Sequence, residues 1–305
     1  MRRSISLLLV LASLGLVTSG CSFTKMAANG TVDVMWAATP AVTHETDVTL
    51  AESGIVGNLK MMEGLSLVVP GNQKLFRMLA EGFSSYAFGF LEPRLWGLDS
   101  ASAKAQALNV RIKTFHARAL KYARVRAKLL VPEVLAAADK GLAALKTALL
   151  GAFDDDEIDA IYWLGHTWSL LVAADTEDLE NVANMSLAEA LLKRAYKAKP
   201  KYEDGLLAGT FGAAQAQLGA GVGGDLKAAK KKFDEAIAVS EGKFLLPTFL
   251  YGRYYCVAIL DKACFVKALQ GILAADAKAW PKRTLTNVLV QKWARYWLTR
   301  ASELF

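Results

Sequence analysis

Histidine, cysteine and proline are scarce in this chain of 305 residues. The three histidines, His44, His116 and His166, lie far apart in the sequence and lack the close spacing of metal ligands. No Ser/His/Asp or Cys/His arrangement of the kind used in nucleophilic catalysis is visible. The sequence therefore predicts no catalytic residue, no metal and no cofactor, and it favours a protein that is not an enzyme.

Long apolar runs are also missing, and the N-terminal one falls short of a membrane span. Residues 5–17 form an apolar stretch of thirteen residues after the basic Arg2 and Arg3. A membrane-spanning helix needs roughly 20 apolar residues. A basic start followed by a short apolar core is typical of a secretory signal peptide, which we assign to residues 1–20.

Cys21 directly follows this leader and allows two kinds of processing. Ser19-Gly20-Cys21 resembles a bacterial lipobox, in which the thiol is alkylated with diacylglycerol and the chain is cut just before it. Thr18 departs from the motif, which usually has Leu there, and ordinary cleavage near Ser19 is the alternative. We predict lipidation of Cys21, because two acyl chains hold a protein on a membrane where one barely would. Ser22 in place of aspartate favours the outer membrane over the inner, facing the periplasm.

A strong excess of charge of one sign is absent too. Without residues 1–20, the chain carries 34 basic and 29 acidic residues, a net charge of about +5. Lys and Arg are scattered among Ala and Leu instead of clustering with aromatic residues. This distribution indicates solvated helix faces and argues against nucleic-acid binding.

Helix-favouring Ala, Leu and Lys dominate what remains, and no stretch alternates as a strand would. Residues 21–50 show no sustained period, so we predict a flexible tether there and a single helical domain over residues 51–305. Asn72 is a predicted helix cap. The clearest predicted helices cover residues 72–91, 101–130 and 132–150. The predicted fold class is all-α.

The second half of the chain repeats a pattern that resembles the tetratricopeptide repeat. Small residues at set positions let two antiparallel helices approach closely, and large residues fill the gaps. The matching residues are Leu164, Gly165, Trp168, Ala188, Leu192, Ala195 and Pro200, then Ala229, Phe233 and Ala236, and finally Tyr251, Gly252, Tyr255, Cys264, Ala268 and Gly271. The pattern predicts an α-solenoid-like bundle of antiparallel helix pairs, and chance Ala-rich heptads are the alternative.

Aromatic residues are abundant in the same half and allow two interpretations. On neighbouring helices they could line an apolar cavity, but we favour ordinary core packing for each of them. Trp293, Tyr296 and Trp297 share a face of the last helix with Leu289 and are expected to seal the end of the solenoid. The set is Trp163, Trp168, Phe211, Phe249, Tyr251, Tyr254, Tyr255, Trp293, Tyr296 and Trp297.

Three local features have a plain structural interpretation. Gly219, Gly221 and Gly224 form a G-x-G-x-x-G, but a helical pattern precedes them instead of the strand that a nucleotide-binding unit requires. We therefore predict a flexible inter-helix loop there. The acidic residues 154–157 are expected to begin a helix, because the macrodipole favours negative charge at that end. His166 falls within a repeat helix and is expected to be packed or hydrogen-bonded.

Cys256 and Cys264 flank a predicted turn, one on each helix of a hairpin. Export permits disulfides. Free cysteine is nevertheless commonly a small buried residue, and both cysteines occupy small-residue packing positions. We predict two free thiols.

From about residue 72 to the C-terminus, the chain resembles the T component (TatT) of tripartite ATP-independent periplasmic (TRAP) transporters. The resemblance rests on the lipoprotein leader and on the blocks "IDAIYWLGHTWSLLVAA" (158–174), "AEALLKRAYKAKPKYEDG" (188–205), "GGDLKAAKKKFDEAIAVSEGK" (223–243) and "LTNVLVQKWARYWLTRASELF" (285–305). It implies a periplasmic lipoprotein of degenerate helix pairs that forms a homotrimer around a solute-binding P component and handles a hydrophobic ligand in an apolar pore or pocket. The alternative is a helical-repeat scaffold lipoprotein for envelope assembly, without a small-molecule ligand.

Overall fold

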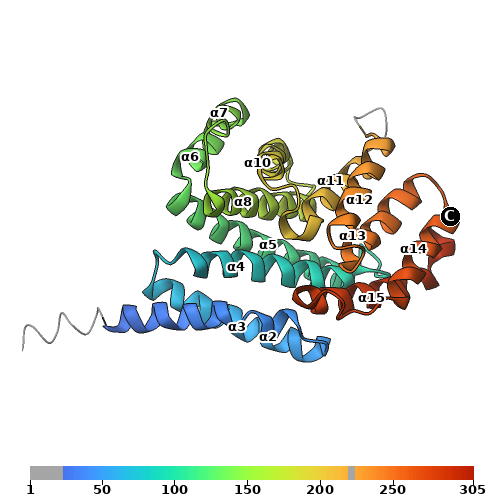
Figure 1. Ribbon diagram of the computed structural model, residues 1–305, viewed down its shortest axis with the longest axis horizontal. Coiled ribbons are helices and arrows are strands. Elements are labelled where there is room, and N and C mark those ends of the chain that lie inside the picture. The colour runs from blue at the N-terminus through green and yellow to red at the C-terminus, as the bar shows by residue number, and fades with distance from the viewer. Residues whose placement is uncertain (1–22, 219–223) are drawn as a thin grey trace, which may run out of the picture.

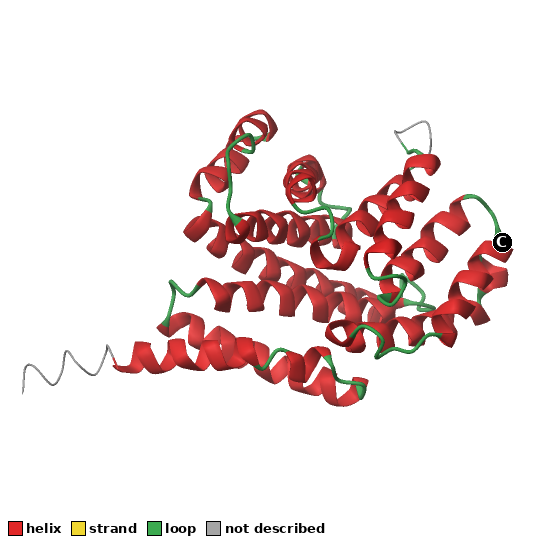
Figure 2. Cartoon of the chain, in the orientation of Figure 1, coloured by secondary structure: helices red, strands yellow, loops and turns green. Residues whose placement is uncertain are grey.

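The computed structural model describes residues 23–218 and 224–305, and every regular element within them is helical (Figure 2). The prediction of an all-α fold is confirmed. Cys21, the predicted signal peptide, Gly219 and Gly221 lie outside the described residues. No described helix is both long enough and apolar enough to cross a bilayer.

The helices follow one another with short connections. The first half contains helical residues 23–37, α2 (Pro40–Thr43), α3 (Val48–Val68), α4 (Gln73–Tyr86), the π-helical η1 (Ala87–Leu91), the 3₁₀ turn η2 (Glu92–Leu95), α5 (Ala103–Leu130), α6 (Pro132–Lys140) and α7 (Leu142–Ala148). The second half contains α8 (Asp155–Ala174), α9 (Leu179–Ala183), α10 (Met185–Ala198), η3 (Tyr202–Gly205), α11 (Leu206–Gln217), α12 (Leu226–Val239), α13 (Leu245–Leu250), the π-helical η5 (Tyr251–Cys256), α14 (Lys262–Ala274), η6 (Pro281–Arg283), α15 (Thr284–Thr299) and η7 (Ala301–Glu303).

The N-terminal segment is helical where the sequence predicted a flexible tether over residues 21–50. Ala28 and Val32 lie one helical turn apart and are both buried. Asn72 Nδ2 donates a hydrogen bond to Asn29 Oδ1 at 2.7 Å, which joins this helix to the start of α4. The tether prediction is wrong for the described part of this segment, because a stripe of two buried side chains produces no sustained hydrophobic period.

The long helices of the first half lie in successive layers that continue into the second half, with α3, α4, α5 and α8 following one another side by side (Figure 1). Asn72 caps α4 as predicted, since its side chain accepts a hydrogen bond from the Leu75 amide at 3.0 Å. Leu75, Leu79 and Phe83 form the buried stripe of α4. This stripe has the helical spacing that the sequence pattern indicates.

The helix predicted from Pro132 to residue 150 is two helices. Gly141 has φ 107°, a conformation that residues with a Cβ rarely adopt. α6 ends and α7 begins at this glycine. The break depends on a backbone angle that the hydrophobic pattern does not encode.

Two helix pairs pack as the tetratricopeptide pattern predicts. α8 lies against α10, and a Cβ added at Gly165 would be 2.9 Å from Leu191 Cβ and 3.0 Å from the Ala188 carbonyl oxygen. α11 lies against α12, and a Cβ added at Gly212 would be 3.0 Å from the Phe233 ring. Glycine at these two positions therefore permits the close approach of the paired helices.

The last pair, α13–η5 and α14, departs from the predicted register. Gly252 does lie close to α14, since a Cβ there would be 2.7 Å from Leu269 Cδ1. Gly271, however, is exposed, and the buried positions of α14 are Phe265, Leu269 and Ile272. Each lies one residue after its predicted counterpart. A one-residue shift is consistent with the π-helical turn of η5, which holds more residues per turn than an α-helix.

Cys256 and Cys264 form a disulfide, so the prediction of two free thiols is wrong. Their Cα atoms lie 5.6 Å apart, within the usual range for a disulfide. The intervening turn, with Leu260 at φ 54°, returns the start of α14 to the end of η5. The bridge therefore ties the two helices of this hairpin together.

We expect Gly165→Ala to lower the free energy of unfolding by about 1–3 kcal/mol, because the added methyl group must displace α10 from α8. Gly57→Ala is the matched control, since Gly57 is in α3 and has no atom within 4 Å of a Cβ position. That change should be neutral or stabilising by about 0.5–1 kcal/mol. Urea denaturation followed by circular dichroism measures both, and equal stability of the two variants would contradict the packing described.

Candidate functional site: an aromatic interior beside a buried ion-pair network

A buried arginine, Arg77 on α4, contacts three carboxylates. Its Nη1 donates to Glu81 at 2.5 Å, its Nε to Asp159 at 3.2 Å and its Nη2 to Glu203 at 3.1 Å. The guanidinium carbon also lies 3.9 Å from the ring centroid of Trp163. The side chain is 9% exposed, so these charged hydrogen bonds replace its hydration. Arg77 therefore joins α4 to α8 and η3.

Two further arginines extend this network to α5 and to the start of α15. Arg126 of α5 pairs with Asp159. Arg283 of η6 pairs with Glu203, and its Nε donates to Asp204 at 2.6 Å. The network consequently connects helices from both halves of the chain. The sequence does not reveal this network, because none of these residues stands in a recognisable motif.

The two acidic residues of η3 reach the network from an unusual backbone. Glu203 and Asp204 have φ 50° and 58°, and Gly205 follows at φ 84°. Three successive left-handed residues are rare outside functional or tightly constrained turns. A Cβ at Gly205 would lie 2.7 Å from the Ala236 carbonyl oxygen, so both the conformation and the available space require glycine.

His116 is fully buried and His166 is partly buried next to the network, and the two lie close enough to interact electrostatically. His166 stacks on Tyr162 with ring centroids 5.3 Å apart, which confirms that it is a packed residue. Burial lowers the pKa of His166 to about 4, so it is neutral at pH 7. His116 shares a hydrogen bond with Glu92 through Nε2 at 2.8 Å, while its buried Nδ1 has no partner among the described residues.

The aromatic face of α15 packs against the first half of the chain. Trp293 meets Phe88 of η1 edge-to-face with centroids 5.5 Å apart, and Trp297 lies 5.4 Å from Trp96. The ring centroid of Phe249 on α13 also lies 5.6 Å from that of Trp293. This face therefore lies against η1 and the segment after η2, and its sealing of the end of the solenoid stays a prediction. The periodicity of the sequence identified this face of α15 but not the elements against which it packs.

The predicted aromatic residues divide by accessibility. Core packing is confirmed for those that are buried: Trp163, Trp168, Phe249 and Trp293. The others keep part of their surface accessible: Phe211, Tyr251, Tyr254, Tyr255, Tyr296 and Trp297. Phe88 and Trp96, which lie outside the repeat pattern, are partly accessible too. An apolar surface therefore persists where η1, η5 and α15 meet.

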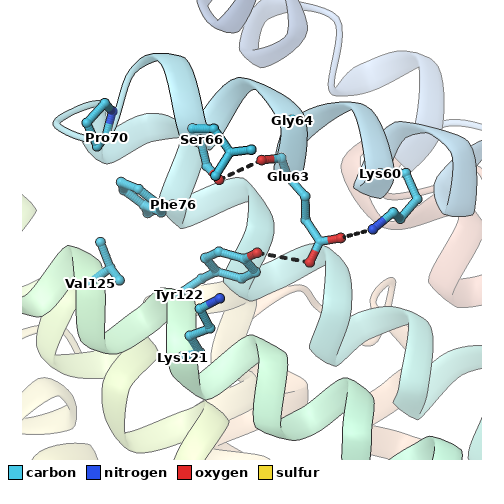
Figure 3. Close-up of a pocket in the computed structure, with 10 residues that line it drawn as sticks. Lys60, Glu63, Gly64, Ser66, Pro70, Phe76, Lys121, Tyr122 and Val125 are labelled. Atoms are coloured by element: carbon cyan, nitrogen blue, oxygen red, sulfur yellow. Dashed lines mark hydrogen bonds and ion pairs between the residues drawn. The ribbon is translucent and has the colours of Figure 1, made fainter.

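A separate groove of about 540 Å³ lies between α3 and α5 beside the start of α4 (Figure 3). Phe76, Tyr122 and Val125 supply apolar surface from α4 and α5, as Figure 3 shows. Glu63 on α3 accepts hydrogen bonds from Lys60 at 2.5 Å and from Tyr122 at 2.9 Å. Burial and the bond to Glu63 raise the pKa of Tyr122 to about 12. The Glu63 carboxylate already accepts hydrogen bonds from Lys60 and Tyr122. The groove therefore offers a contact surface and not a reactive group.

Two other sequence features can be placed. Asp154 caps α8, and Glu157 completes a capping box, which confirms the predicted acidic helix start. Within residues 23–218 and 224–305, no three His, Cys, Asp or Glu side chains are grouped so that they could hold a metal ion.

The model of the TRAP transporter T-component family matches residues 44–305. The chain belongs to this family. An uncharacterized protein of Treponema pallidum (strain Nichols) is 22% identical over 269 residues, which cover 88% of this chain and 83% of that relative. The T-component match includes α3, so it begins earlier than the resemblance seen from residue 72 onwards. This is a family of transporter components and not of enzymes.

We expect Glu203→Gln to lower the free energy of unfolding by about 3 kcal/mol at pH 7, because it leaves two buried arginines short of a carboxylate. Burial favours the neutral form of Glu203, but Arg283 and Arg77 outweigh it and hold its pKa below the usual value. A carboxyl group of this kind stabilises the fold above its unfolded pKa of about 4.3, and the contribution is lost as the pH falls. The difference from wild type should therefore shrink between about pH 5 and pH 3.

Urea denaturation at several pH values measures this effect. Glu189→Gln is the matched control, because Glu189 pairs with Lys193 at an exposed position of α10. That variant should stay within about 0.5 kcal/mol of wild type throughout. A loss for Glu203→Gln that does not change with pH would show that the charge of Glu203 does not stabilise the network.

Proposed function

We propose that this protein is the accessory T component of a TRAP transporter, a periplasmic lipoprotein that forms a homotrimer and binds the solute-binding P component. The family match over residues 44–305 carries the proposal, since it spans the packed array from α3 to α15. Stacked helix pairs present an extended surface that suits holding a partner better than catalysis. A helical-repeat scaffold for envelope assembly is the second candidate, because helix pairs alone would serve either role.

A hydrophobic ligand is the second part of the proposal. Its support is the partly accessible aromatic surface where η1, η5 and α15 meet, formed by Phe88, Trp96, Tyr254 and Trp297. Aromatic rings provide large apolar contact area at low conformational cost. The scaffold alternative gives this surface no role, so ligand binding separates the two candidates.

The anchor is expected to depend on the Cys21 thiol, since a thioether to diacylglycerol requires sulfur. Cys21→Ser, expressed in a Gram-negative host, should move the protein from the detergent phase to the soluble periplasmic fraction. Phase partitioning with Triton X-114 measures this shift. A Cys21→Ser protein that stays in the detergent phase would contradict lipidation at this position.

We expect the mature protein to sediment as a trimer and to bind a P-type solute-binding protein encoded beside it. A stable specific interface of this kind buries on the order of 1,200–2,000 Å². Analytical ultracentrifugation of the two proteins at micromolar concentration tests the association, with an unrelated periplasmic binding protein as the control. A monomer that ignores the neighbouring P component would favour the scaffold candidate.

A further inference from the structure

Arg253, on the π-helical turn η5, differs from the arginines of the ion-pair network. Its guanidinium carbon lies 4.1 Å from the ring centroid of Trp297 and 5.9 Å from that of Tyr254. Arg77, Arg126 and Arg283 each pair with carboxylates. Arg253 makes no hydrogen bond or ion pair with any residue that the structure describes, so its five N–H donors are uncommitted among those residues.

The surroundings of Arg253 are apolar and partly desolvated. Burial lowers the pKa of its guanidinium, and the neighbouring Tyr254 opposes that shift. Trp297 also has a buried Nε1 without a hydrogen-bond partner among the described residues. The carboxylate of Glu92 is close enough to Tyr254 to interact with it electrostatically, but it is hydrogen-bonded to His116 and not to Arg253. A partly buried cation without a counter-ion is costly unless an anion joins it.

The chemistry of this place selects a particular kind of anion. A guanidinium offers parallel N–H donors that match the two oxygens of a carboxylate. No second cation contacts Arg253 within residues 23–218 and 224–305, so one negative charge is neutralised better than two. The partly accessible rings of Tyr254 and Trp297 adjoin the guanidinium. Trp96 lies against Trp297 with ring centroids 5.4 Å apart, so these rings together suit an apolar chain.

We propose that Arg253 binds the carboxylate of a monocarboxylic acid whose apolar tail lies against Tyr254 and Trp297. This inference rests on the hydrophobic-ligand part of the proposed function and adds the chemical class of the ligand. The cation–π contact holds the guanidinium over the indole ring of Trp297, which orients its donors towards the bound headgroup.

The test uses cis-parinaric acid and its methyl ester as fluorescent probes, with the Cys21→Ser mature protein so that no detergent is needed. Energy transfer from tryptophan reports binding. The acid should bind at least about tenfold more tightly than the ester, as expected for a charged hydrogen-bonded pair. Arg253→Gln should abolish this preference while leaving the affinity for the ester unchanged. Arg253→Lys should retain part of the preference, because lysine keeps the positive charge but lacks the parallel N–H donors of the guanidinium.

Arg295→Gln is the matched control, since Arg295 is an exposed arginine on α15, and it should retain the full preference. Equal binding of the acid and the ester by the protein that retains Arg253 would overturn the role of this arginine and leave the hydrophobic-ligand proposal standing. Failure of both probes to bind would overturn both. The acid–ester comparison needs no substitution, so it decides the matter even if Arg253→Gln unfolds.

Discussion

The charge of Arg77 must be neutralised inside the protein, and the arrangement of the surrounding helices follows from that constraint. Its carboxylate partners come from α4, α8 and η3, which are far apart in the sequence. Glu203 then requires Arg283, and through it the start of α15 is held against the middle of the chain. Breaking one pair would leave an uncompensated charge among apolar side chains, which costs far more than an exposed pair does. The network thus favours one relative placement of the helix pairs.

This placement creates the interior that we interpret as functional. With α15 held by Arg283, its aromatic face meets η1, and Trp293 packs against Phe88. His166 is kept neutral by burial, so the neighbouring interior carries little unpaired charge. Arg253 is the exception, a cation that stacks on an indole ring and has no carboxylate partner among the residues that the structure describes. The π-helical form of η5 fits this interpretation, because such turns are frequent at functional sites.

The T-component family match and the architecture support one another at different levels. The match covers residues 44–305 and shows the family, while the packed helix pairs show why the chain can present a broad surface to a partner. Neither observation depends on a catalytic group. The disulfide between Cys256 and Cys264 suits an exported protein, and it ties together the hairpin that carries Arg253.

The sequence by itself determined the helical fold class, the caps at Asn72 and Asp154, and the close approach at Gly165, because these depend on periodicity and residue size within short stretches. It could not determine the break at Gly141, because a single backbone angle leaves no periodic signal. Nor could it determine the pairing of Cys256 with Cys264, because that depends on whether the two side chains point towards each other across the turn. The charged network and the aromatic site depend on contacts between separate helices, such as that of Arg77 with Asp159, 82 positions later. Only the tertiary structure decides such contacts, because they arise from how whole helices are placed and not from the local sequence around either partner.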